Sequence, residues 1–204
     1  MLIAVGSLST TAVLALLLQG AVRERISLAT AYVALGLLGV TLSLGPLNVL
    51  RERPNPVSFD RRRDFGIWSA LFGLAHTAIG LTVHLRGRMW LYFLPAPESP
   101  GVLGLRTDPF GAANYAGLVA ALLLLLLATI SNDLSLRRLG TERWRTIQRW
   151  AYLLAGLTVV HGALYQLIEK QRLPLVGLFV ALAAAVTVLQ LAGRRRRRTP
   201  RAPR

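Results

Sequence analysis

Long apolar segments separated by short basic connections dominate this 204-residue sequence. A transmembrane α-helix needs about 20 consecutive, mostly apolar residues. Six segments have about that length: Leu2–Val22, Ile26–Leu47, Phe65–Leu85, Pro109–Ile130, Trp150–Ile168 and Leu173–Ala192. Only 16% of the residues are charged, and they cluster between these segments, whereas a soluble domain spreads its charges over its surface. We therefore predict an all-α membrane protein, a bundle of six transmembrane helices over residues 1–192.

The first segment, Leu2–Val22, has some features of a secretory signal peptide. It lacks a basic region before the apolar run, and that run is long for the hydrophobic part of a signal peptide. We expect a retained transmembrane helix, with a cleaved signal peptide as the alternative.

The basic residues predict the orientation of the bundle. Of the 24 Lys and Arg residues, 17 follow the second, fourth or sixth segment, and seven lie at the opposite ends. Because cytoplasmic loops are enriched in Lys and Arg, we expect both termini to be cytoplasmic. Residues 193–204 should then form a basic, disordered cytoplasmic tail. Since nearly every basic cluster adjoins an apolar segment, the net charge of +15 does not favour nucleic acid as a partner.

The chain contains no cysteine. Disulfides, thiolate metal sites, iron–sulfur clusters and cysteine nucleophiles are therefore excluded for this sequence. A bound metal ion would have to rest mainly on the three histidines, His76, His84 and His161.

Two of these histidines lie at the same expected depth in the membrane. His76 follows Asp64 by 12 residues, His161 follows Arg149 by 12, and both helices run outward from the cytoplasmic side. Each imidazole should therefore lie about 18 Å along its helix, near the midplane. Two neutral imidazoles that face each other at one depth can supply both axial ligands of a haem iron.

Small or hydroxyl-bearing residues flank both histidines. Most lie three residues before or four residues after a histidine, and so on the same face of its helix, and one directly follows His161. Such residues leave room for a flat ring or can bond to it. The candidate cofactor contacts are Gly73, Gly80, Thr158, Gly162 and Tyr165. The alternative is purely structural, because a membrane histidine can bond to a neighbouring helix and glycine can serve close helix packing.

The third histidine, His84, lies about 12 Å farther outward than His76. A second haem there would need a partner near Ile168, where the closest polar residues are Gln166 and Glu169. We keep His84 as a weaker candidate iron ligand. An interfacial histidine, or one that touches a haem edge or a quinone headgroup, is the favoured alternative.

Three sequence blocks between about Arg61 and Arg172 resemble the ferric reductase-like transmembrane domain family, which includes the haem-binding membrane subunit of the bacterial methionine sulfoxide reductase system. The blocks are Arg61–Gly66 leading into Leu74–His76; Ser131–Asp133 with Leu136–Gly140; and Arg143-Trp144 with Arg149–Tyr152, ending in Val160–Gly162. The resemblance implies a six-helix fold with b-type haem on the histidines of the third and fifth helices, here His76 and His161.

These observations predict a membrane b-type cytochrome that relays single electrons and carries one haem, with a second haem not excluded. About a dozen residues follow the sixth segment. We therefore expect a quinol or a separate flavoprotein as electron donor and a separate redox acceptor. If the protein takes part in an enzyme, it would be an oxidoreductase subunit, with no catalytic side chain of its own assigned. A bacterial inner membrane is the expected location. The alternative is a haem-free transporter or assembly subunit.

Overall fold

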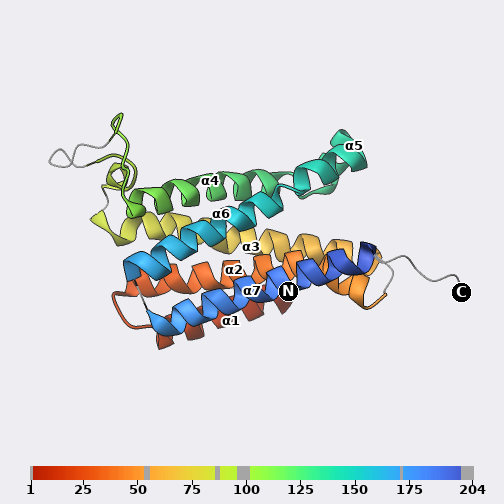
Figure 1. Ribbon diagram of the computed structural model, residues 1–204, viewed down its shortest axis with the longest axis horizontal. Helices are drawn as coiled ribbons and strands as arrows, with labels where there is room; N and C mark the ends of the chain where they lie inside the picture. The colour runs from red at the N-terminus through yellow and green to blue at the C-terminus, as the bar shows by residue number, and fades with distance from the viewer. Residues whose placement is uncertain (1, 53–55, 86–87, 96–101, 171, 199–204) are drawn as a thin grey trace, which may run out of the picture.

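The computed structural model of this protein is an elongated bundle of helices that run nearly side by side (Figure 1). It describes residues 2–52, 56–85, 88–95, 102–170 and 172–198. The α-helices are α1 Leu2–Leu17, α2 Val22–Leu50, α3 Pro56–Val83, α4 Pro109–Thr129, α5 Asp133–Gln148, α6 Ala151–Ala163 and α7 Leu173–Arg198. A 3-10 turn, η2, covers Met89–Tyr92, and a π-helix, η3, extends α6 over Leu164–Lys170.

Within the described residues, five helical segments are long and apolar enough to cross a membrane: Val22–Leu50, Arg61–Val83, Pro109–Thr129, Asp133–Ile168 and Leu173–Arg198. The all-α membrane fold is thereby confirmed. The first helix, α1, has only 16 residues, or about 24 Å of helix, against roughly 30 Å for the hydrocarbon core. Its start agrees with the predicted segment, but it ends five residues earlier.

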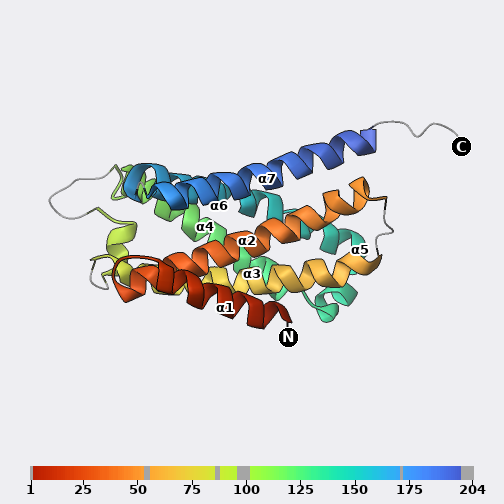
Figure 2. The same cartoon turned by 90° about the horizontal axis from the view of Figure 1, so that it is seen from below.

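Helix α2 is the centre of the bundle. It packs against α1, α3 and α7, while α4 packs against α3 and α6. Figure 2 shows α1 and α7 on opposite sides of α2. Ile3 and Leu14 of α1 pack against Val33, Leu37 and Phe72 in the core. The first helix is thus an integrated part of the described bundle.

A second core cluster joins α2, α4 and α6 near the ends that meet α5. Its buried residues are Leu38, Leu42, Ala120, Leu123, Leu127, Ala151 and Leu154. These side chains fill the space between the three helices on that side of the bundle. Three of them, Leu38, Ala120 and Leu154, also line the internal cavity that is described below.

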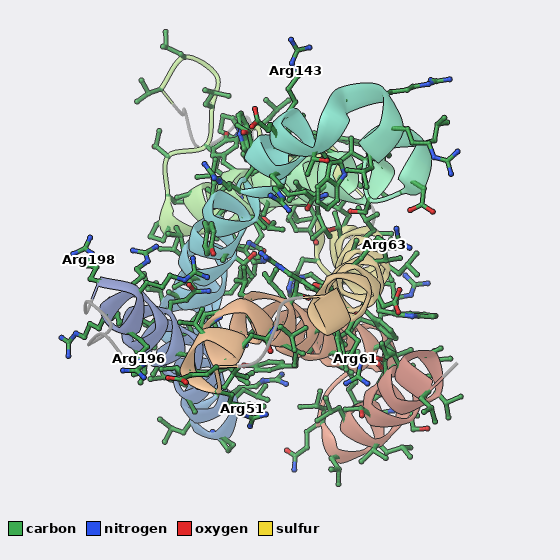
Figure 3. All side chains as sticks on the ribbon, turned by 90° about the vertical axis from the view of Figure 1, so that its right-hand side faces the viewer. Arg51, Arg61, Arg63, Arg143, Arg196 and Arg198 are labelled. Atoms are coloured by element: carbon green, nitrogen blue, oxygen red, sulfur yellow. The ribbon has the colours of Figure 1, made fainter. Side chains whose placement is uncertain are left out.

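Arginines gather at one end of the molecule, which we call the basic end. Figure 3 shows six of them there, from α3, α5, α7 and the residue that follows α2: Arg51, Arg61, Arg63, Arg143, Arg196 and Arg198. Two ion pairs link these elements, Arg63 with Asp133 and Arg196 with Glu52. The opposite end, which carries η2, is called the outer end below.

Besides the shorter α1, the structure differs from the sequence-based expectation at α5 and at the end of α7. The connection before the fifth predicted segment contains the amphipathic helix α5, which has no buried residue and is kinked at Gly140, where φ is +73°. Helix α7 continues through Arg198, so the first arginines of the predicted disordered tail are helical, and residues 199–204 lie outside the described residues.

Candidate functional site

A cavity of about 280 Å³ lies inside the bundle between α2, α3, α4 and α6. Every residue that the sequence singled out as a cofactor or metal contact lines this one cavity. These residues are Gly73, His76, Gly80, His84, Thr158, His161, Gly162 and Tyr165. The fold therefore brings the whole predicted set together, although it comes from α3, α6 and η3.

The imidazole of His76 is oriented by α2. Its Nδ1 atom lies 2.9 Å from the main-chain oxygen of Ser27 and 3.2 Å from the Ser27 hydroxyl. Because a carbonyl oxygen only accepts hydrogen bonds, Nδ1 must carry the ring proton. The other nitrogen, Nε2, then keeps its lone pair and can bind a metal ion.

The imidazole of His161 is oriented in the same manner by α4. Its Nδ1 atom lies 2.8 Å from the main-chain oxygen of Ala113, so this nitrogen also donates and Nε2 again keeps its lone pair. Gly117 makes room for the ring, because a Cβ atom there would lie 2.6 Å from Nδ1 of His161. The sequence analysis did not identify Gly117, because no local pattern in the sequence links it to His161.

The two imidazole rings are close neighbours in the cavity wall. Their centroids are 6.2 Å apart and their planes are inclined by 72°. Two imidazoles on opposite sides of one metal ion have centroids roughly 6 Å apart, because each metal–nitrogen bond is about 2 Å long. A haem supplies the other four nitrogen ligands itself, so two histidines suffice. The described residues contain no group of three or more His, Asp or Glu side chains that could hold a metal ion.

Two of the predicted cavity glycines make room for protein side chains. A Cβ atom on Gly73 would lie 2.6 Å from Leu124 Cδ2, and one on Gly162 would lie 2.6 Å from Phe179 Cε2. At these positions the structure displays the packing role that was kept as the alternative. Gly80 is different, because a Cβ atom there would lie 3.8 Å from His76 Cε1, in ordinary contact with the ring.

The two predicted hydroxyl groups have different partners. Thr158 Oγ1 donates to the main-chain oxygen of Leu154 within α6, at 2.9 Å. Tyr165 donates to Asn114 Oδ1 on α4, also at 2.9 Å, and its ring centroid lies 5.0 Å from that of His161. Tyr165 belongs to the π-helix η3, and π-helical turns often occur at functional sites.

His84 lines the outer end of the same cavity, beyond the last turn of α3. Its main-chain nitrogen donates to the hydroxyl of Tyr92, and that hydroxyl donates to the main-chain oxygen of Gly80. The His84 ring packs edge-on against Phe110, with centroids 6.4 Å apart. Burial raises the pKa of Tyr92, so Tyr92 stays protonated and can donate this bond.

One further cavity residue, Gln166, is nearly inaccessible, with 5% of its surface exposed. Its Oε1 atom is buried and has no hydrogen-bond partner among the described residues. The sequence analysis named Gln166 only as a polar neighbour. Its location inside an apolar segment is the signal, because buried polar groups in membrane helices are costly and often functional.

Matches to known proteins include a family model and a related protein. The model of the family described as ferric reductase like transmembrane component matches residues 30–159, which include His76 and His84 and end two residues before His161. An uncharacterized protein from Treponema pallidum (strain Nichols) is 33% identical over 100 residues. That alignment covers 49% of this chain and 25% of the relative, so the matched part spans about a quarter of the relative's length.

Proposed function

This chain belongs to the ferric reductase-like transmembrane family, and on that premise we propose that it is a membrane b-type cytochrome that relays single electrons across or within the bilayer. Family membership supports a multi-pass membrane protein with an electron-transfer role. The haem, its ligands and its redox partners are our proposal, and the geometry of the cavity supports them.

His76 and His161 would hold the haem iron through their Nε2 atoms. The observation that carries this assignment is the matched tautomer of the two rings, since each Nδ1 faces a main-chain carbonyl oxygen. The bound haem would supply an iron that changes oxidation state by one electron. With His76 and His161 as its two protein ligands, such an iron would transfer electrons and would not bind oxygen or substrate.

The surrounding residues would keep this site dry and rigid. The carbonyl groups of Ser27 and Ala113 hold the two tautomers, and such outer contacts also make an imidazole a better metal ligand. Leu124 and Phe179 occupy the space beside Gly73 and Gly162, where they exclude water from the cavity wall.

The electron donor would be a quinol or a separate flavoprotein, and the acceptor a separate redox protein or ferric iron. The basic end supports an acidic protein partner by charge complementarity (Figure 3). Anionic lipid headgroups suit the same arginines, so the basic end also fits the inner surface of a membrane.

We place the protein in the inner membrane of a bacterium, with six crossings and both termini in the cytoplasm. The gathering of arginines at one end of the bundle supports this orientation. Helix α1 would make the sixth crossing, with a tilted bundle or a locally thinned bilayer compensating for its length.

Absorption spectroscopy of the purified protein tests this function. After expression with haem supplied, the protein should display a Soret band and a sharp α band on reduction with dithionite. If neither band appears, the proposal is wrong, and the haem-free transporter or assembly subunit takes its place.

A further inference from the structure

The cavity continues beyond the paired histidines toward the outer end. His84, Phe93 and Gln166 line this part, which we call the outer chamber. It lies within one continuous cavity with His76 and His161. A molecule in the outer chamber would therefore be close to any cofactor that these two histidines hold.

Gln166 gives the outer chamber an unused hydrogen-bond acceptor. The residue is 5% exposed, and its Oε1 atom has no partner in the part of the chain that the structure describes. A buried acceptor without a donor is unfavourable and rare in folded proteins. A ligand that brings a hydroxyl or amine donor would remove this penalty.

The rest of the wall is mostly apolar and reaches the lipid-facing surface. Leu28 and Ala31 of α2 line the cavity together with Leu118 of α4. Leu118 has 41% of its surface exposed, so the wall at this point is also part of the outside of the bundle. A ligand with an apolar tail could enter from the bilayer at this side and keep its tail in lipid.

We propose that the outer chamber binds the headgroup of a lipid-soluble hydroquinone, with one ring hydroxyl donating to Gln166 Oε1. A hydroquinone combines a hydroxyl donor, a flat ring and an apolar tail, which are the three features that the chamber requires. This inference rests on the proposed cytochrome function and assigns its electron donor. Oxidation to the quinone releases two electrons, which the proposed cytochrome would take one at a time and pass on to its separate redox acceptor, and two protons, which pass to water at the outer end.

The acceptor also predicts which redox form binds better. Quinone oxygens only accept hydrogen bonds, whereas hydroquinone hydroxyl groups donate. The reduced form should therefore bind more tightly than the oxidised form. Product release after electron transfer would follow from the same contact.

Calorimetry with the purified full-length protein under anaerobic conditions tests the site. The probes are a short-tail ubiquinol and a short-tail menaquinol, each compared with its oxidised form. Gln166→Leu should weaken binding of the reduced probe about 5–10-fold, as expected for the loss of one buried hydrogen bond. Gln166→Met serves as a second variant. Gln190→Leu is the matched control, because Gln190 bonds to Leu42 on α2 and does not line the cavity.

The thermal midpoint of the ligand-free protein provides an independent readout. Gln166→Leu removes an unpaired buried acceptor, so its Tm should equal or exceed that of the wild type, whereas a structural hydrogen bond would make the Tm fall. Haem absorption is recorded on the same samples. If the wild type shows haem bands but binds neither hydroquinone, the inference about the outer chamber is overturned and the proposed function is not. A Gln166→Leu protein whose α band is shifted or lost would instead place Gln166 against the haem and also overturn it.

If the wild type shows no haem bands, the proposed function is refuted. The binding data alone then test the outer chamber as a hydroquinone site. Hydroquinone binding that depends on Gln166 would still support the site in that case. Absence of such binding would refute both proposals.

Discussion

The imidazole rings of His76 and His161 lie with their centroids 6.2 Å apart, and each faces a carbonyl oxygen of a further helix through Nδ1. Ser27 on α2 orients the first ring and Ala113 on α4 orients the second. Four helices therefore meet at one pair of side chains. This arrangement holds two Nε2 lone pairs inside one cavity, and it is the basis of the predictions below.

Replacement of either paired histidine should abolish haem retention. His76→Ala and His161→Ala each remove one of the two axial nitrogen ligands of the proposed haem, and the remaining histidine cannot form a six-coordinate low-spin iron alone. The measurement is the ratio of Soret to protein absorbance after purification. Retention of a normal low-spin spectrum in either variant would contradict the ligand assignment.

His84→Ala is the matched control for these two variants. We expect its low-spin spectrum to stay largely intact, because His84 lies at the outer end of the cavity and packs against Phe110. Loss of the spectrum in this variant would show that the ligand pair is wrongly chosen.

A methyl group at Gly117 should disturb His161. The Cβ atom of Gly117→Ala would lie 2.6 Å from His161 Nδ1, so the ring must move away from the Ala113 carbonyl. We expect a loss of about 1–3 kcal/mol of stability, as for other overpacked sites, together with weaker haem binding. Thermal unfolding followed by absorbance measures both effects.

Gly36→Ala provides the opposite case for comparison. A Cβ atom at Gly36 would meet nothing within 4 Å, and Gly36 lies inside α2. Alanine there should stabilise the protein by about 0.5–1 kcal/mol through helix propensity alone. If Gly36→Ala and Gly117→Ala change the stability in the same direction and by a similar amount, the effect of Gly117→Ala is not caused by the close approach of His161.

The N-cap of α4 should make the stability of the protein fall at acid pH. The Arg106 guanidinium bonds to the Asp108 carboxylate and holds its pKa below the usual range, and the Gly111 amide assists. Because the folded pKa is lowered, this stabilisation is complete above the usual carboxylate pKa of about 4 and is lost as the pH falls through the lowered value.

Asp108→Asn isolates this ion pair, because asparagine is also a good N-cap. At pH 7 the variant should be less stable by up to about 1 kcal/mol, as expected for a partly exposed pair. Melting temperatures measured between pH 7 and pH 3 should converge for the two proteins. A difference that stays constant down to pH 3 would contradict the role of the charge.

Single cysteines can report the orientation, because the natural chain has none. Leu103→Cys lies at the outer end, where Leu103 is 94% exposed, and Arg143→Cys lies at the basic end. In intact cells a membrane-impermeant maleimide should label the first variant and reach the second only after lysis. The reverse pattern would refute cytoplasmic termini.

Residues in or next to the sequence blocks that resemble the family contact one another near the basic end. Arg63 pairs with Asp133, and Trp144 Nε1 donates to the main-chain oxygen of Ile130 at 2.9 Å. Gln148 Nε2 lies 3.1 Å from Ser131 Oγ. The first contact ties α3 to the start of α5, and the other two tie the second half of α5 to the residues that follow α4. These residues, unlike the two histidines, therefore have a structural role, because they fix how the helices connect at the basic end.

The helical membrane fold could be predicted from the sequence because hydrophobicity acts locally. A run such as Pro109–Thr129 must be helical in lipid, since the bilayer offers no partner for its main-chain groups. The capping residue Asp108 marks where this helix begins, and its side chain accepts from Gly111. The length of α1 and the start of α5 at Asp133 depend on packing and on the interface, and were not predicted.

The depth of His76 and His161 likewise followed from counting residues along two helices, because the helical rise is constant. Their facing arrangement in one cavity depends on how α3 and α6 pack around α2 and α4. No local pattern specifies that the Ser27 and Ala113 carbonyls bond to the two rings, or that Gly117 makes room for one of them. The sequence by itself thus determined the helices and the level of the histidines, and only the tertiary structure decided their tautomers and the unpaired acceptor of Gln166, because these depend on contacts between helices.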